Sequence, residues 1–169
     1  MCGRFTLTTA GDAIKDYFQI KTPLQLTPRY NIAPSQDILV VRQNDDKQNE
    51  GAFLRWGLTP SWTKANKLNQ SGWINARLET VAEKPAFRQA FKKRHSLIIA
   101  DGFYEWQLLN SRQKQPFYFH KKDSTVFAFA GIWEAWENEE GHMIESCAIL
   151  TKKANALSLR ARRAESEGE

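Results

Sequence analysis

Cys2 has the most distinctive potential chemistry of any residue in this sequence. It stands directly behind the initiator methionine in MCGRF (1–5), and a small second residue commonly allows that methionine to be removed. Cys2 would then carry a free α-amine, which titrates near ~7.7–8.0, and a thiol, which titrates near ~8.5. An aldehyde would form an imine with the amine, and the sulfur would close on the imine carbon to give a thiazolidine ring. The position alone also fits a second residue without a role.

Asn75 and Arg77 lie in GWINARLET (72–80), where they alternate with Ile74 and Ala76. In an extended segment this alternation places both polar side chains on one face. An asparagine amide donates and accepts hydrogen bonds, and an arginine can bind a phosphate with two parallel bonds. The pattern therefore fits a site for a phosphate-bearing ligand, although it also describes a polar sheet face in solvent.

Glu105 is the one acidic residue within ADGFYEWQ that has aromatic residues on both sides, Tyr104 and Trp106. Aromatic surroundings disfavour the ionised form of a carboxylate, which suits general acid/base catalysis near neutral pH. The alternative is a glutamate on the solvent side of a half-buried strand. A fourth group of interest is RWGLTPSW (55–62) with Trp73, because aromatic rings between cations can stack nucleobases. Trp56 is instead expected in the core.

The segments that must position these side chains are mainly strands. Strands are predicted by apolar alternation at 37–41, 52–58, 95–109 (bent at Asp101-Gly102), 115–122, 125–137 and 145–153. Short helices are predicted at 8–20 and 84–94. The proline-containing segment 22–36 is expected to be irregular, and 59–73 to be a long surface loop. These elements predict one α+β domain with a curved, largely antiparallel sheet.

The composition limits the possible classes of protein. With 169 residues, 41% apolar and 12% aromatic, the chain is long enough for one globular core. There is no apolar run of ~18 residues and no signal-peptide pattern, so we expect a cytosolic or nucleoid protein without a membrane partner. Two cysteines and three histidines in no ligand-like spacing predict no metal. A net charge of +5 permits an anionic partner.

Seven short motifs in this sequence closely resemble, in order, those of the SRAP (SOS response-associated peptidase) family, whose members are abasic-site processing proteins. The motifs are MCGRF (1–5), RYNIAPSQ (29–36), RWGLTPSW (55–62), INARLET (74–80), AFR (86–88), ADGFYEW (100–106) and FAFAGIWE (127–134). The resemblance runs from residue 1 to about 155. It implies a single α+β domain whose curved, mostly antiparallel sheet forms a pseudo-barrel with a few short helices and a groove for single-stranded DNA.

The resemblance also implies a reaction and a set of residues. The protein would cap abasic sites in single-stranded DNA, because the ring-opened abasic sugar is an aldehyde that can form a thiazolidine with the aminothiol. AP-lyase cleavage through the imine, reversal of the cross-link and self-processing at Met1 are implied as well. The residues carried over are Cys2 as nucleophile, Asn75 to orient the sugar, Glu105 as acid/base, Arg4 and Arg77 for phosphates, and Trp106 beside the DNA.

One departure from the family pattern lies near the end of the sequence. The family has a histidine in an H-x-R-M-P-like motif, and Arg160 stands about where it is expected. His95, His120 and His142 match no such motif, so none is assigned a role. Arginine does not deprotonate and cannot act as an imidazole proton shuttle. We therefore divide the chain into a SRAP domain at 1–155, which lacks the C-terminal part of the family domain, and a divergent charged tail at 156–169.

Two other functions stay open from the sequence alone. An N-terminal-nucleophile amidohydrolase would use the α-amine of Cys2 as the base for its own thiol. A single-stranded DNA-binding module would use the aromatic and basic residues without any covalent step. We expect a monomer that requires no cofactor and caps abasic sites in single-stranded DNA.

Overall fold

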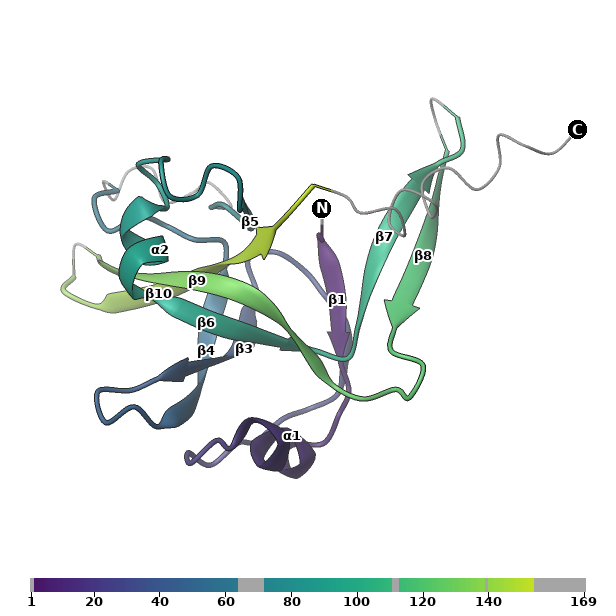
Figure 1. The fold of residues 1–169 in the computed structure, drawn as a ribbon, viewed down its shortest axis with the longest axis horizontal. Coiled ribbons are helices and arrows are strands. Elements are labelled where there is room, and N and C mark those ends of the chain that lie inside the picture. Colours follow the sequence, from purple (N-terminus) through teal and green to yellow (C-terminus); the bar gives the residue numbers. More distant parts are fainter. Residues whose placement is uncertain (1, 64–71, 111–112, 139, 154–169) are drawn as a thin grey trace, which may run out of the picture.

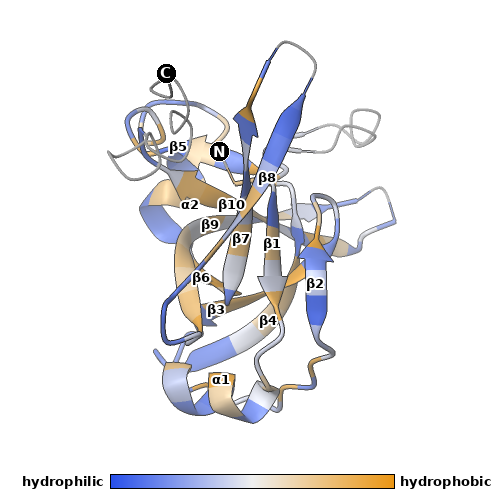
Figure 2. Cartoon of the chain, turned by 90° about the vertical axis from the view of Figure 1, so that its right-hand side faces the viewer, coloured by the Kyte–Doolittle hydropathy of each residue, from blue (hydrophilic) through white to orange (hydrophobic). Residues whose placement is uncertain are grey.

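Two sheets and two short helices make up the part of the chain that the computed structural model describes, residues 2–63, 72–110, 113–138 and 140–153. Figure 1 shows the larger sheet curving around a core while β7 and β8 of the smaller sheet extend away from it. In Figure 2 the barrel strands β6, β9 and β10 are mainly hydrophobic, whereas the edge strands β2 and β8 carry more hydrophilic residues. Polar edges discourage unwanted strand pairing.

The larger sheet closes into a five-stranded barrel. Its strands are β3 (Asp37–Gln43), β4 (Asn49–Trp56), β6 (His95–Ala100), β9 (Phe127–Glu137) and β10 (Met143–Thr151). Neighbours pair antiparallel in the order β4-β3-β6-β9-β10, and a parallel pairing of β10 with β4 closes the ring. The short strand β5 (Asn75–Arg77) adds to β10 in parallel. The interior is filled by fully buried side chains such as Trp56, Ile98 and Cys147.

The smaller sheet has the strand order β2-β1-β7-β8. Its strands are β1 (Arg4–Leu7), β2 (Arg29–Ile32), β7 (Gly102–Leu108) and β8 (Lys114–His120), and all pairings are antiparallel. Phe5 joins it to the barrel, because its ring lies 5.1 Å from that of Trp56 and 6.2 Å from that of Phe129. This contact buries the inner face of β1 in the main core.

The two helices pack at different places: α1 against the main core, and α2 against β6 and β9 on the face away from that core. Helix α1 (Gly11–Phe18) buries Ile14 and ends where Gln19 adopts a left-handed backbone with φ 54°. Helix α2 (Arg88–Lys93) buries Ala90 and begins only after a hydrogen-bonded turn in which Phe87 and Arg88 donate to the Lys84 carbonyl. The predicted helix at 84–94 is therefore shorter than expected. No helix within the described ranges is long and apolar enough to cross a membrane.

The predicted α+β fold with a curved, barrel-like and mostly antiparallel sheet is confirmed. The bend at Asp101-Gly102 also lies where the sequence predicts it, between β6 and β7. Two details differ: the strands form two sheets rather than one, and 29–32 is strand β2 inside the segment expected to be irregular. A four-residue strand carries little periodicity, and β2 is specified by its pairing with β1. Residues 64–71 of the predicted loop, Arg160 and the predicted tail at 156–169 lie outside the described residues.

Asp101 ties the end of β1 to the turn between β6 and β7. One carboxylate oxygen accepts a hydrogen bond from the Thr6 hydroxyl at 2.5 Å, and the other accepts bonds from the backbone and hydroxyl groups of Thr8 and Thr9. Asp101 also donates its own backbone N–H to the Thr6 carbonyl. This buried carboxylate therefore fixes where β1 lies along β7.

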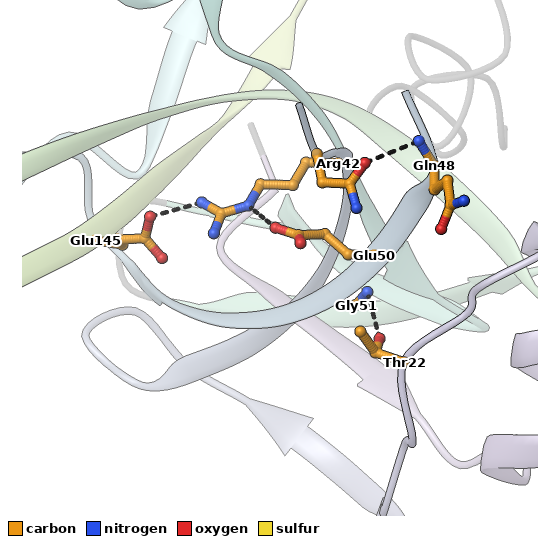
Figure 3. Close-up of polar contacts among 7 residues, drawn as sticks. Thr22, Arg42, Gln48, Glu50, Gly51 and Glu145 are labelled. Carbon is orange, nitrogen blue, oxygen red and sulfur yellow. Dashed lines mark hydrogen bonds and ion pairs between the residues drawn. The ribbon is translucent and has the colours of Figure 1, made fainter. Parts of the chain in front are cut away.

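Arg42 makes a second polar cluster, close to the seam where the barrel closes. Its guanidinium contacts Glu50 of β4 at 2.7 Å and Glu145 of β10 at 2.6 Å, so it links the two strands that pair at the closure (Figure 3). The same group lies 4.2 Å over the ring of Trp133. Ion pairing and cation–π contact both act here on a half-buried cation.

Candidate functional site

Cys2 is enclosed by the fold although it is the second residue of the chain. Only 6% of its surface is exposed, and it belongs to the main hydrophobic core. Its backbone carbonyl accepts a hydrogen bond of 3.0 Å from the Asn75 side chain, and its Sγ donates to the Arg4 carbonyl at 3.6 Å. In Figure 1 the N-terminal end of β1 lies between β5 and β7. Cys2 is thus held where the barrel and the smaller sheet meet.

Asn75 is positioned by pairing of β5 with β10. Asn75 lies opposite Ile149, and the residue before it, Ile74, accepts a hydrogen bond of 2.9 Å from the indole of Trp56. The amide nitrogen of Asn75 is used by Cys2, but its Oδ1 is buried and has no hydrogen-bond partner among the described residues. A buried acceptor without a donor is costly. Oδ1 is therefore suited to accept a bond from an amine or hydroxyl that enters the site.

Glu105 lies on β7, the neighbour of β1. The pairing of Arg4 with Tyr104 brings this part of β7 beside the start of β1, and Glu105 is half-buried. Alternation along the strand puts Glu105 on the same face as Phe103 and Gln107, which is the face toward the barrel. Its negative charge acts on the Cys2 thiol. The structure therefore brings together the three residues predicted for catalysis.

The thiol of Cys2 is held in its neutral form. Burial is the main cause that raises its pKa from the ordinary value of 9.0 to about 12, and the charge of Glu105 raises it further. Cys147 is buried on β10, and its pKa is also raised to about 12, mainly by burial. A thiol with such a pKa is protonated at neutral pH, so its attack on an electrophile needs a base to accept the proton. Of the two cysteines, only Cys2 has a nearby acidic side chain from the predicted site.

The residues predicted to contact DNA occupy two different surfaces. Arg77 is exposed at the end of β5, two residues beyond Asn75. Arg4 projects on the opposite, outer face of the smaller sheet and donates to Asn31 Oδ1 at 3.2 Å. Trp106 is on that same outer face, 39% exposed, with its ring 6.4 Å from that of Tyr104. Trp106 therefore lies on the opposite face of β7 from Glu105, whose charge acts on the Cys2 thiol.

An open pocket of about 380 Å³ adjoins Asn75. Its lining combines aromatic, basic and small apolar side chains: Trp62, Trp73, Asn75, Arg77, Lys84, Pro85, Ala86 and Phe87. Trp62 is 64% exposed and Trp73 46%, whereas Trp56 is buried as the sequence predicts. The tryptophan-rich group thus divides into a core residue that positions Ile74 and two rings that line the pocket. Sequence reasoning missed Lys84 and Phe87, whose only signal was their place in or beside the AFR motif.

The histidines and possible metal ligands lie elsewhere. His95 packs against Phe91, His120 ends β8, and His142 pairs with Glu140 in a surface turn. Within the described ranges there is no group of three or more His, Cys, Asp or Glu side chains placed to hold a metal ion. The described side chains around Cys2 offer a thiol, an amide and a carboxylate.

Comparison with known proteins gives consistent matches over most of the chain. The model of the family described as SOS response associated peptidase (SRAP) matches residues 1–162. The abasic site processing protein YoaM of Bacillus subtilis is 45% identical over 158 residues, which cover 92% of this chain and 69% of that protein. The abasic site processing protein HMCES of Rattus norvegicus is 27% identical over 198 residues, covering 89% of this chain and 56% of that protein.

Solved structures share the fold. A protein from Bacteroides thetaiotaomicron aligns with a TM-score of 0.84 at 22% identity, covering 98% of this chain and 74% of that one. A protein from Bordetella bronchiseptica aligns with a TM-score of 0.78 at 26% identity, covering 99% of this chain and 80% of that one. The arrangement of barrel and smaller sheet is therefore a fold that has been observed experimentally.

Proposed function

The chain belongs to the SOS response associated peptidase family, and on that premise we propose that it binds single-stranded DNA and caps abasic sites covalently through Cys2. The observation that carries this proposal is the position of Cys2: enclosed by the fold, held by Asn75 through its carbonyl, and beside the charge of Glu105. The names of the relatives supply the substrate, an abasic site. The reaction requires that Met1 has been removed, because only then is the nitrogen of Cys2 an amine.

The proposed reaction joins the aminothiol to the aldehyde of the ring-opened sugar with loss of one water. The α-amine of Cys2 adds to the aldehyde carbon to give a carbinolamine, which loses its hydroxyl as water to form an imine. The sulfur then adds to the carbon of the imine, which still carries its N–H proton, and the thiol proton restores the acid that protonated the departing hydroxyl. The product is a thiazolidine, and no oxidant, reductant or cofactor is consumed. The raised pKa keeps the thiol protonated at neutral pH, whereas the α-amine is partly unprotonated. The amine therefore reacts before the sulfur.

Glu105 and Asn75 have separate parts in this sequence. Glu105 donates a proton to the departing hydroxyl of the carbinolamine and then accepts the thiol proton as sulfur attacks. Asn75 fixes Cys2 through its amide nitrogen, and its unpartnered Oδ1 accepts a hydrogen bond from the amine or from a sugar hydroxyl. Proton removal from the carbon next to the imine would instead lead to β-elimination of the 3′ phosphate, which is the proposed lyase activity. We place self-processing at Met1 within the same proposal.

The two surfaces around Cys2 provide the contacts to the DNA strand. Arg77 and Lys84 line the pocket beside Asn75 and supply positive charge for phosphates, while Trp62 and Trp73 offer exposed rings for bases. Arg4 carries positive charge on the other side of Cys2. A strand that crosses the site would therefore meet cations on both sides of the reacting sugar.

A cross-linking assay tests the proposal, after intact-mass measurement has shown that Met1 is absent. Single-stranded oligonucleotides with and without an abasic site are incubated with the protein and separated on a denaturing gel. We expect a heat-stable shifted band only with the abasic oligonucleotide. The band should vanish in Cys2→Ala and persist in Cys147→Ala, the matched control for the other buried cysteine.

The outcomes separate the possible functions. Equal cross-linking by Cys2→Ala would contradict the proposal. A binding module would give a shift on native gels alone, weakened steeply by salt. An amidohydrolase would give neither band, and its substrate would be an amide.

A further inference from the structure

A continuous row of aromatic rings lies on the outer face of the smaller sheet. The rings of Trp106 and Tyr104 are 6.4 Å apart, those of Tyr104 and Tyr118 are 5.1 Å apart, and those of Tyr118 and His120 are 5.4 Å apart and stacked at 26°. Tyr104 and Tyr118 are direct cross-strand partners, so they share one face of the sheet. We call these four residues the aromatic track.

The rings of the track are anchored at their polar ends. The Tyr118 hydroxyl lies 2.9 Å from Thr6 Oγ1, and the Tyr104 hydroxyl donates to the Tyr30 carbonyl at 3.3 Å. The Tyr118 ring lies directly over Gly102, where a Cβ would overlap it. Glycine therefore leaves the space that lets this ring lie against the backbone. One side of the ring rests on the sheet, and Tyr118 as a whole remains 48% exposed.

The charges of this sheet favour an anionic partner. Two cationic side chains, Arg4 and Lys114, lie on the face of the track, because they pair with Tyr104 and Leu108, and the single carboxylate of the four strands is Glu105. Alternation places Glu105 on the opposite face, so no carboxylate of these strands competes for a partner on the track. Exposed aromatic surface of this extent usually marks a binding site. Rings that offer flat faces beside cations suit nucleobases and their phosphates.

The track begins beside the reactive residue. Tyr104 is the cross-strand partner of Arg4, which is two residues from Cys2, and the track continues from there across β7 to β8. Figure 1 shows these two strands extending away from the barrel, on the other side of β1 from β5. Asn75 and Arg77 of β5 line the pocket. A strand held at Cys2 can therefore reach the track and the pocket in opposite directions.

We propose that the aromatic track stacks the bases of single-stranded DNA on one side of the lesion, with Tyr104, Tyr118 and His120 extending the contact already assigned to Trp106. This inference rests on the proposed function for the identity of the partner. It adds a second, sequence-tolerant binding surface, because any base can stack on an aromatic ring.

The test compares two substitutions of Tyr118 with a control elsewhere. Tyr118→Leu removes the ring, Tyr118→Phe keeps the ring but removes the hydroxyl contact to Thr6, and Tyr17→Leu removes a comparably exposed tyrosine from α1. Binding is measured by fluorescence anisotropy with an undamaged single-stranded oligonucleotide, after thermal unfolding has shown that each variant is folded. We expect Tyr118→Leu to weaken binding roughly 10-fold, as the loss of one stacked base predicts. Tyr118→Phe and Tyr17→Leu should bind like the parent.

Oligonucleotides of different lengths locate the contact. Abasic oligonucleotides are prepared with long flanks on both sides of the lesion, or with one flank removed. Tyr118→Leu should bind the oligonucleotide with both flanks more weakly than the parent does. This difference in affinity should disappear when the flank that reaches the track is removed and persist when the other flank is removed. A penalty that survives removal of either flank, or that is absent throughout, overturns the inference.

The readouts keep this inference distinct from the cross-linking chemistry. Anisotropy with undamaged DNA requires no reaction at Cys2, so a loss of binding in Tyr118→Leu supports the track even if no cross-link forms. Unchanged DNA binding together with self-association that Tyr118→Leu abolishes, measured by sedimentation, would assign the track to a second copy of the chain and overturn the inference. Equal losses in Tyr118→Leu and Tyr118→Phe would attribute the effect to the Thr6 contact and would overturn it too.

Discussion

Cys2 is buried, and burial is unusual for a residue with the chemical role that we propose for it. Burial raises the pKa of its thiol to about 12, which protects the sulfur from oxidation and from indiscriminate reaction at neutral pH. The same burial would make the thiol a poor nucleophile in a reaction that began at sulfur. A route that begins at the amine avoids this difficulty, because sulfur then reacts within an intermediate already attached to the same residue. The high effective concentration of the sulfur beside the imine carbon then compensates for the low reactivity of the protonated thiol.

Glu105 should influence the amine-first reaction and the free thiol in opposite directions. In Glu105→Gln the cross-linking rate should fall at least about 10-fold, because the acid/base group is gone. The Cys2 thiol should meanwhile react faster with iodoacetamide at a fixed pH, because the charge of Glu105 helps to raise its pKa and removing that charge lowers the pKa. Denaturing gels measure the first rate and mass spectrometry of the alkylated peptide the second. Glu83→Gln, at an exposed position, is the control.

Rates that move together would argue against this division of roles. A fall in both would indicate that Glu105 maintains the structure around Cys2. A rise in both would indicate that its charge merely suppresses the thiol.

Individual site residues could be chosen from the sequence, but their contacts could not. Cys2, Asn75 and Glu105 were identifiable from residue type, local pattern and motif, and the structure brings them together. The bond between the Asn75 amide and the Cys2 carbonyl joins residues 73 positions apart, and no local pattern encodes it. Lys84 and Phe87 also line the pocket only because distant segments pack together, so no local pattern predicts their place there.

Among the elements, β1 has the most demanding position because Cys2 lies two residues before its first residue, Arg4. It is short, and its inner residues Phe5 and Leu7 are buried while its end is held by Asp101. Burial opposes ionisation of Asp101, but hydrogen bonds from Thr6, Thr8 and Thr9 outweigh it and lower the pKa of this carboxyl. The carboxylate is thus the anchor that sets the register of β1 against β7.

Asp101→Asn should destabilise the protein by about 2–4 kcal/mol, because an amide cannot accept all the bonds that the two carboxylate oxygens accept. The pH dependence has a defined sign: the pKa of Asp101 is lower in the folded state, so its contribution is present above the ordinary value near ~3.9 and is lost as the pH falls through the folded value. Urea unfolding at several pH values measures both effects. The variant should lose less stability than the parent on acidification, whereas exposed Asp46→Asn should follow the parent. Parallel acid profiles for Asp101→Asn and the parent would refute this assignment.

Most elements of the barrel were predictable because their strands alternate or are continuously apolar. The hairpin at 37–58 and the bend at Asp101-Gly102 are local features with clear turn residues. Two features were not predictable: strand β2, and the start of α2 at Arg88 instead of at residue 84. Pairing with β1 specifies β2, and packing of Phe87 against the buried side chains of Leu58 and Ile132 holds the turn that precedes α2.

For the whole molecule, the decisive contacts join segments that are far apart in the sequence. The barrel closes only when β10, at residues 143–151, pairs with β4, at residues 49–56. Composition and strand count indicate a curved sheet, but they contain no signal for this parallel closure or for the separation of β1, β2, β7 and β8 into a second sheet. Long-range pairing of this kind is also slow to form.

The distance in sequence between β1 and β7 has a consequence for the life of the newly made chain. A ribosome adds roughly 5–20 residues per second, so on the order of ten seconds separate the synthesis of Cys2 from that of Trp106. During that interval β1 has no β7 to pair with, and the N-terminus is open to the aminopeptidase of the translation machinery. We therefore expect methionine aminopeptidase to remove Met1 far more readily during translation than after folding, so that the proposed self-processing would act only on chains that fold with Met1 retained.

Full-length protein prepared with Met1 retained should lose this residue to methionine aminopeptidase much more slowly than a free peptide of residues 1–20, as measured by intact mass. Equal rates would show that the pairing of β1 gives no protection. On this expectation, the order in which the strands are synthesised sets a time limit for removing Met1: the aminothiol would form while the chain is still growing, and the completed fold would then enclose it.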